Sequence, residues 1–219
     1  MQVKIYSTSG NETSSTIELS PNVFDVQISE GCVYYALNNE LANRRTGTAC
    51  TKTRAEVNYS NVKPFKQKGT GNARRGDAKS PVMVGGGTIF GPRPRDYSFK
   101  LPKKMKRSAF RSLLSSAVKD DRLVVLEDFD IKSGKTKEME KIVLNFSRER
   151  ERTVVIIPDD HSLIRRASAN IPFLHVLAYD KLSVKELFYG KKILVLESAV
   201  RNLNQFYGDE DSDEGGSLE

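Results

Sequence analysis

The stretch GTGNARRGD at residues 69–77 has the spacing that comes nearest to a site for phosphate chemistry. Gly71 and Gly76 are separated as in a phosphate-binding loop, in which a following Lys reaches the phosphates and a Ser or Thr holds Mg²⁺. Asp77 and Ala78 stand at those two positions, no strand pattern precedes the stretch, and no helix pattern follows it. The sequence therefore argues against a nucleotide site. The glycines indicate instead a backbone that takes positive φ angles or approaches a polyanion closely.

Two pairs of carboxylates follow apolar runs, at the end of the strands where ligands bind in doubly wound α/β folds. Glu127 and Asp128 come after one run, and Asp159 and Asp160 come after the next. Such carboxylates could chelate Mg²⁺, which would suit an α/β enzyme acting on nucleic acid. They equally suit helix caps and solvated turns, and we favour this second interpretation because no nucleophile accompanies them.

The histidines and cysteines do not have the spacing of a metal site or a catalytic triad. His161 and His175 lie on either side of a predicted helix without ligand-spaced partners. Cys32 and Cys50 alone cannot form a disulfide framework or a four-ligand zinc site. We expect free thiols in a reducing cytosol, no metal, no cofactor and no enzymatic activity.

Positive charge is concentrated in one part of the chain. Residues 44–107 hold 17 Lys and Arg against 3 Asp and Glu, a net charge of +14, whereas the remainder holds 18 basic and 25 acidic residues, a net charge of −7. An ordinary soluble surface interleaves both signs, so this separation indicates a polyanionic partner, nucleic acid above all. The cations expected to contact RNA phosphates include Arg44, Arg45, Lys52, Arg54, Arg75, Lys79, Arg93, Arg95, Lys103 and Lys104.

Aromatic residues are interleaved with these cations. Phe65, Phe90, Tyr97 and Phe99 could stack on unpaired bases. For Tyr97 and Phe99, packing of the loop base onto the rest of the protein is an equal alternative.

The central segment, residues 46–102, shows neither a helix nor a strand period. Its run of three glycines at 85–87 and its prolines at 92, 94 and 102 oppose both structures. A structureless stretch of this length inside a compact domain is unusual unless it is functional. We expect an extended RNA-binding loop between helices at 30–43 and 103–119, which orders on RNA.

The rest of the chain alternates strands and helices. Continuous apolar runs at 123–126, 154–157, 176–178 and 193–196 predict strands buried on both faces of a parallel sheet, and further strands are expected at 3–6 and 16–19. Helix patterns separate or follow these strands, at 137–146, 161–169, 183–190 and 197–207. Asp159-Asp160 are expected to cap the helix at 161–169. A capping box at Ser183 is expected to open the helix at 183–190, and Gly190 to end it. The order predicts a three-layer α/β fold, with a mostly parallel sheet, helices on both faces and the long basic loop inserted between two helices.

These patterns divide the chain into three parts. Residues 1–45 and 103–207 would form one globular α/β domain, 46–102 the RNA-binding loop, and 208–219 a disordered acidic tail. The tail holds six acids and no base, which suits a solubilising segment or, alternatively, a shield for the basic segment before assembly. The first residues lack the apolar run of a signal peptide and no later run is long enough for a membrane span, so we expect a cytoplasmic protein with no membrane partner.

Two runs, KTRAEV at 52–57 and KPFKQKGTGNARRGDAKSPVMVGGGTIFGPRPRDYSFKLPKKM at 63–105, resemble the bacterial large-subunit ribosomal protein L4 family (uL4). The similarity covers about residues 1–207 and is strongest in 44–107, where the motif KPxxQKGTGxARxG is long and specific. The position of the loop between two helices of an α/β domain also matches. The sequence departs from the family pattern at Phe65, where Trp is frequent, at Lys66, where Arg is usual, and at Asn72, where Arg is frequent. These departures affect individual stacking and phosphate contacts.

The resemblance implies a structural constituent of the large ribosomal subunit, a primary rRNA-binding protein that aids early assembly. Its globular domain would lie on the outside of the subunit, and its loop would reach inward to line part of the polypeptide exit tunnel. Carried over, the inner-loop residues that bind rRNA are Lys63, Lys66, Gln67, Lys68, Gly69, Thr70, Gly71, Arg74 and Gly76, and the candidates for the tunnel wall are Lys63, Phe65, Lys66 and Gln67. The implied partners are large-subunit rRNA, neighbouring large-subunit proteins and, as in some family members, the leader mRNA of its own operon.

Overall fold

The computed structural model describes residues 1–131, 133–147, 150–159 and 161–208. The chain divides into two compact units. The globular unit comprises residues 1–41 and those from 99 onward, and the inserted unit comprises residues 42–98. Each is described by itself below.

The described residues form six strands and seven helices. The strands are β1 (Gln2–Tyr6), β2 (Glu12–Glu18), β3 (Leu123–Leu126), β4 (Thr153–Ile157), β5 (Leu174–Ala178) and β6 (Lys192–Leu196). The helices are α1 (Pro21–Phe24), α2 (Glu30–Asn43), α3 (Lys103–Lys119), α4 (Thr136–Phe146), α5 (Ser162–Ser168), α6 (Val184–Tyr189) and α7 (Glu197–Gly208).

The strands form one sheet in the order β2-β1-β3-β6-β4-β5. Only the edge strand β2 is antiparallel to its neighbour, while the other described strands pair in parallel, with Val125 opposite Val195 and Val155 opposite Leu194. All five residues of β4 are buried, which explains why residues 154–157 form a continuous apolar run. The predicted α/β fold with a mostly parallel sheet is confirmed.

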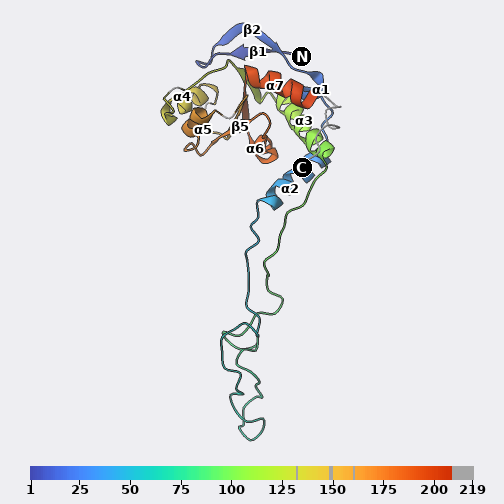
Figure 1. Cartoon of the computed structure of the whole chain (residues 1–219), viewed down its shortest axis with the longest axis vertical. Coiled ribbons are helices and arrows are strands. Elements are labelled where there is room, and N and C mark those ends of the chain that lie inside the picture. The colour runs from blue at the N-terminus through green and yellow to red at the C-terminus, as the bar shows by residue number, and fades with distance from the viewer. Residues whose placement is uncertain (132, 148–149, 160, 209–219) are drawn as a thin grey trace, which may run out of the picture. The chain divides into compact units, whose positions relative to one another are not determined.

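Helices cover both faces of this sheet (Figure 1). On one side α4 packs against α5, and on the other α3 packs against α1 and α6, with α7 next to α1. The crossovers through α4 and α5 move the chain towards β5, whereas the crossover through α6 brings it back to β6. Because such crossovers are right-handed, the reversal places α6 on the face opposite α4 and α5. Leu114 of α3 and Met139 of α4 are fully buried in the resulting core.

The structure differs from the sequence predictions at some element boundaries. β5 begins at Leu174, two residues before the predicted strand, and β2 begins at Glu12 instead of Thr16. The sequence of β2 is largely polar and exposed, so hydrogen bonding to β1 determines its length, and no apolar pattern could indicate it. The short helix α1 was not predicted, although it buries Val23 and Phe24.

The predicted cap of α5 is wrong. The N-cap residue is His161, and its side chain makes no capping hydrogen bond. Asp159 instead accepts the His161 N–H through its backbone carbonyl, at 2.9 Å, and Asp160 lies outside the described residues.

The predicted start and end of α6 are confirmed, with a different physical reason at each end. Ser183 Oγ accepts the Glu186 N–H at 3.3 Å, but the Glu186 carboxylate pairs with Arg152 instead of completing a capping box. Gly190 ends the helix with a φ of −67°, which any residue can adopt. A Cβ there would lie 2.9 Å from the Glu186 carbonyl oxygen and 3.0 Å from Val154 Cγ2, so this position needs space and not a left-handed backbone.

Candidate nucleic-acid interface

The inserted unit is held by a few backbone hydrogen bonds between its outgoing and returning limbs. Thr51 N–H donates to the Pro92 carbonyl at 3.1 Å, and Thr88 N–H donates to the Lys52 carbonyl at 2.9 Å. Residues 46–102 contain turns and bends but no helix or strand, as their composition predicted. The backbone N–H and C=O groups of this segment therefore remain largely free of regular pairing, which suits binding along a nucleic acid.

One glycine allows the two limbs to approach each other. Gly47 has a φ of +63°, and a Cβ at this position would lie 2.0 Å from the carbonyl oxygen of Arg95. The Arg95 N–H in turn donates to the Gly47 carbonyl, at 3.2 Å. A side chain at residue 47 would thus separate the limbs at the base of the inserted unit.

The glycines of the GTGNARRGD stretch have open surroundings. Gly71 has a φ of +71°, whereas Gly76 is not in the positive-φ region, and at both positions a Cβ would meet none of the described residues within 4 Å. Gly71 therefore serves a backbone bend. Gly76 has no reason within the chain to lack a side chain, which fits the expectation of close approach to a partner.

The predicted RNA-binding residues lie at the surface. Eighteen of the nineteen are exposed, and only Lys79 is half-buried. Two of the exposed residues, Lys103 and Lys104, belong to α3 in the globular unit, and the other seventeen predicted residues lie in the inserted unit. The set combines many cations with few acids, so it can neutralise several phosphates at once.

Some of these cations already have partners in the inserted unit. Arg93 forms a bidentate pair with Glu56, with nitrogen–oxygen distances of 3.0 and 3.2 Å. This pair and the Thr53 N–H lower the pKa of Glu56 to about 2. Arg54 approaches Asp77 at 3.9 Å. Arg93 thus holds the limbs together in this state, which its position in the sequence did not indicate.

The aromatic residues divide into packed and exposed ones. The Tyr97 ring lies 3.9 Å from the Arg45 guanidinium and 4.5 Å from that of Arg95, measured to the ring centroid. Its hydrogen bond with Arg95 lowers the pKa of Tyr97. These contacts hold the Tyr97 ring against two cations of the inserted unit itself. Phe65 is half-buried, and Phe99, in the globular unit, is partly exposed.

Phe90 is fully exposed, and its backbone has a φ of +53°. A bulky residue rarely adopts this conformation, and such local strain is typical of functional positions. Val82, Val84 and Ile89 nearby in the sequence are also exposed, by 92%, 103% and 60%. These three residues are not among the predicted contacts, although apolar side chains in a segment without a core were a usable signal. Together with Phe90 they offer apolar contacts to a partner.

Two residues near the end of α2 fix the point where the chain leaves the globular unit. The buried Asn39 donates its side-chain N–H to the carbonyl of Phe99, where the chain returns. The Glu40 carboxylate accepts hydrogen bonds from Ser183 Oγ at 2.6 Å and from the Lys185 N–H at 3.0 Å. Sequence reasoning missed both, because their partners are at least 60 residues away and no local pattern marks them.

Two of the four carboxylates considered as Mg²⁺ ligands, Glu127 and Asp128, have structural partners. Glu127 accepts the hydroxyl of Thr13 at 2.8 Å, and Asp128 caps α7 by accepting Ser198 N–H and Oγ–H at 3.1 and 2.7 Å. Among the residues that the structure describes, no group of three or more His, Cys, Asp and Glu is placed to hold a metal ion. Both cysteines are free thiols.

Comparison with known proteins gives a consistent result. The profile described as Ribosomal protein L4/L1 family matches residues 17–206. The protein named large ribosomal subunit protein uL4 is 57% identical in Treponema denticola (95% of this chain, 98% of that protein), 51% identical in Treponema pallidum (99% and 100%), and 48% identical in Borreliella burgdorferi strain B31 (94% and 99%). None of the helices in the described part of the chain has the length and hydropathy to cross a membrane.

Proposed function

We infer the role of this chain from the premise that it belongs to the ribosomal protein L4/L1 family. It is a structural component of the large ribosomal subunit, located in the ribosome in the cytoplasm. Its partners are ribosomal, namely rRNA and other proteins of the subunit. A structural role of this kind requires binding surfaces and no reaction centre.

We propose that residues 46–102, with the first turn of α3, form the primary rRNA-binding surface and act early in subunit assembly. The observation that carries this proposal is the exposure of eighteen of the nineteen predicted contact residues within a segment of net positive charge. Each phosphate that such a surface neutralises releases counterions, which favours binding independently of sequence. The exposed Phe90, Val82, Val84 and Ile89 add contacts to bases or sugars.

The inner part of the inserted unit is proposed to line the polypeptide exit tunnel. The candidates Lys63, Lys66 and Gln67 are exposed and Phe65 is half-buried, and Lys63 Nζ donates to Gln67 Oε1. The Lys63→Glu variant should still assemble into subunits, since many other cations hold the segment, but it should change sensitivity to tunnel-binding antibiotics or pausing at stalling peptides. Full incorporation with unchanged drug sensitivity and unchanged stalling would mean that residue 63 does not line the tunnel wall.

Residues 1–45 and 103–207 are proposed to fold as one domain without the inserted loop. Support comes from the core, whose buried apolar residues all lie in the globular unit. Binding to the leader mRNA of its own operon is a further proposal, which rests on the family alone. The alternative of a Mg²⁺-dependent enzyme is less well supported, because Asp128 is engaged in capping α7.

Sedimentation after a high-salt wash tests the proposed role directly. The full chain should remain with large subunits. A matched variant, with residues 48–100 replaced by a short Gly/Ser linker, should keep the helix content of the globular unit by circular dichroism but be lost from washed subunits. Retention of this folded variant would show that the inserted segment is not the main rRNA contact. Loss of the full chain itself would contradict the ribosomal role.

The enzyme alternative is tested by Asp128→Ala and Asp159→Ala. Near-normal growth would support the structural role. Loss of growth with normally folded and normally incorporated protein would support catalysis.

A further inference from the structure

The N-terminal half of α3 presents a basic face on the globular unit. Lys103, Lys104 and Lys106 are exposed, and no carboxylate among the described residues forms an ion pair with them. The first turn of α3 contains no acidic residue, and its N-cap, Pro102, provides no side-chain cap. This face therefore carries concentrated positive charge, and it continues directly from the basic inserted unit in the sequence.

The end of α7 lies against the same half of α3 (Figure 1). Arg111 Nε donates to the Tyr207 carbonyl at 2.8 Å, and the Phe110 and Tyr207 rings lie 5.8 Å apart. One turn closer to the start of α3, the Arg107 guanidinium lies 6.0 Å from the centroid of the Phe206 ring. The end of α7 therefore lies beside the half of α3 that carries the basic face.

The chain continues from this point with the most acidic sequence in the protein. Residues 209–214 read DEDSDE, five acids in six positions. Lys103 lies about 6 Å along the helix from Arg107, whereas six extended residues reach about 20 Å. The segment is therefore long enough to pass the three exposed lysines, and its charge is opposite to theirs.

We propose that residues 209–214 bind the basic face of α3 in the RNA-free protein and are displaced when RNA phosphates bind there. This proposal rests on the proposed rRNA-binding function and adds a regulatory contact to it. The tail acts as a tethered competitor. It weakens binding of short, non-specific RNA that relies on a few phosphate contacts. It affects large-subunit rRNA less, because the many cations of the inserted unit provide contacts that the tail does not mask.

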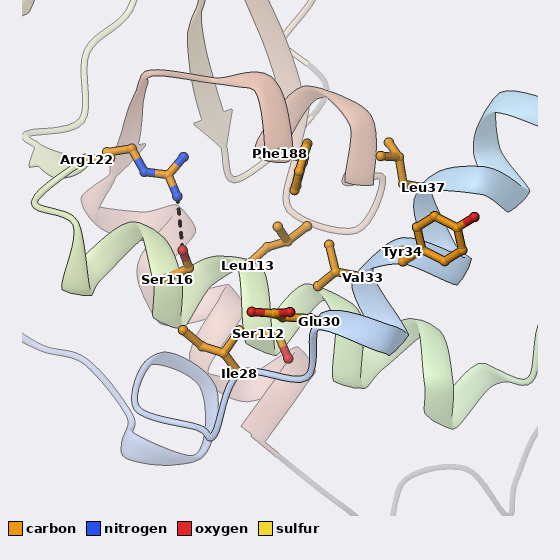
Figure 2. Close-up of a pocket in the computed structure, with 10 residues that line it drawn as sticks. All are labelled: Ile28, Glu30, Val33, Tyr34, Leu37, Ser112, Leu113, Ser116, Arg122 and Phe188. Carbon is orange, nitrogen blue, oxygen red and sulfur yellow. Dashed lines mark hydrogen bonds between the residues drawn. The ribbon is translucent and has the colours of Figure 1, made fainter.

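An apolar hollow of the globular unit does not suggest a comparable partner. It lies between α2, α3 and α6, has a volume of about 480 Å³, and is lined by Val33, Leu37, Leu113 and Phe188 among others (Figure 2). Arg122 at its margin donates to Ser116 and to the Gly190 carbonyl, so it is already used within the unit. Nothing in the structure indicates what would cover this hollow.

The test compares two RNA probes, a fluorescein-labelled 20-nucleotide oligoadenylate and deproteinised large-subunit rRNA, across a salt series. The tail variant carries Asp209→Asn, Glu210→Gln, Asp211→Asn, Asp213→Asn and Glu214→Gln, which removes charge and keeps length. The face variant carries Lys103→Gln, Lys104→Gln and Lys106→Gln. A matched control removes three exposed lysines beside or within α4, with Lys135→Gln, Lys137→Gln and Lys141→Gln.

The tail variant should bind the oligoadenylate about a hundredfold more tightly than the original chain at 0.1 M salt, with a salt dependence steeper by about 2, because three phosphate contacts become available at about 0.7 each and the effect vanishes near 1 M salt. The same tail substitutions should still increase affinity when they are added to the α4 control. They should not increase affinity when they are added to the face variant. The effect on large-subunit rRNA should be smaller.

An unchanged affinity in the tail variant, or an equal gain in the face variant, would overturn the proposal, since the tail would then be inactive or would act through net charge. A gain that grows with protein concentration would also overturn it, because the tail would then bind a second copy of the chain. If no variant, including the original chain, binds large-subunit rRNA in a salt-dependent way, the proposed function itself fails.

Discussion

The cations near the middle of the inserted unit should dominate the salt dependence of RNA binding. Lys66, Lys68 and Arg74 are exposed, and Arg75 has a weak contact with the sulfur of Met83, at 3.3 Å, and no carboxylate partner among the described residues. Unlike Arg93, which is paired with a carboxylate, these four are available to phosphates. We therefore consider a variant in which all four are replaced by Gln.

The expected magnitude follows from counterion release. Each lost phosphate contact removes about 0.7–0.9 from the slope of log K against log salt concentration, so four contacts remove about 3. If the loss is electrostatic and vanishes near 1 M salt, affinity should fall about a thousandfold at 0.1 M and about thirtyfold at 0.3 M. The globular unit should be unaffected, because none of the four contributes to its core.

Fluorescence anisotropy with large-subunit rRNA fragments over this salt range provides the measurement. A control with the same loss of charge carries Lys135→Gln, Lys137→Gln, Lys141→Gln and Lys181→Gln, all exposed on the globular unit. Its slope should change by less than 1. Equal slopes for the two variants would mean that affinity follows net charge and not position, and the assignment of the interface to the inserted unit would be refuted. Circular dichroism confirms that both variants are folded.

Three further predictions concern individual contacts. The Gly47→Ala substitution should separate the limbs near Arg95 and cost about 1–2 kcal/mol locally, seen as faster tryptic cleavage within residues 42–98, and an unchanged cleavage rate would contradict the role of this glycine. The Ser183→Ala substitution should lower the free energy of unfolding by about 1 kcal/mol through loss of the α6 cap and of the hydrogen bond to Glu40, measured as a lower urea midpoint with an unchanged m-value, and no change would mean that these two contacts are not stabilising. The Arg93→Gln substitution should return the pKa of Glu56 from about 2 towards 4.5 in an NMR titration. Because the folded-state pKa is lowered, the pair stabilises the inserted unit above pH 4.5 and loses this contribution as the pH falls towards 2, and a titration unaffected by the substitution would exclude the pair.

The sequence by itself determined those elements whose structure depends on the character of neighbouring residues in the chain. The strands β3 and β6 are buried in a parallel sheet, so nearly every position is apolar and the runs at 123–126 and 193–196 were visible without the structure. The helices α2 and α3 have the predicted bounds. The lack of regular structure in residues 46–102 followed from Gly, Pro and charge, which oppose folding at short range.

Only the tertiary structure decided which distant residues meet. The strand order, with β6 between β3 and β4, depends on packing of whole layers, and no residue pattern specifies it. Likewise, Asp128 caps α7 from 70 residues away, Arg93 pairs with Glu56 across the limbs, and Tyr97 lies against two arginines. Residue type alone made these carboxylates and cations candidates for metal or RNA. Whether each of them can bind a metal or RNA depends on its neighbours in space. A charged group that already has a hydrogen-bonded partner must give up part of that interaction in order to bind a metal ion or a phosphate.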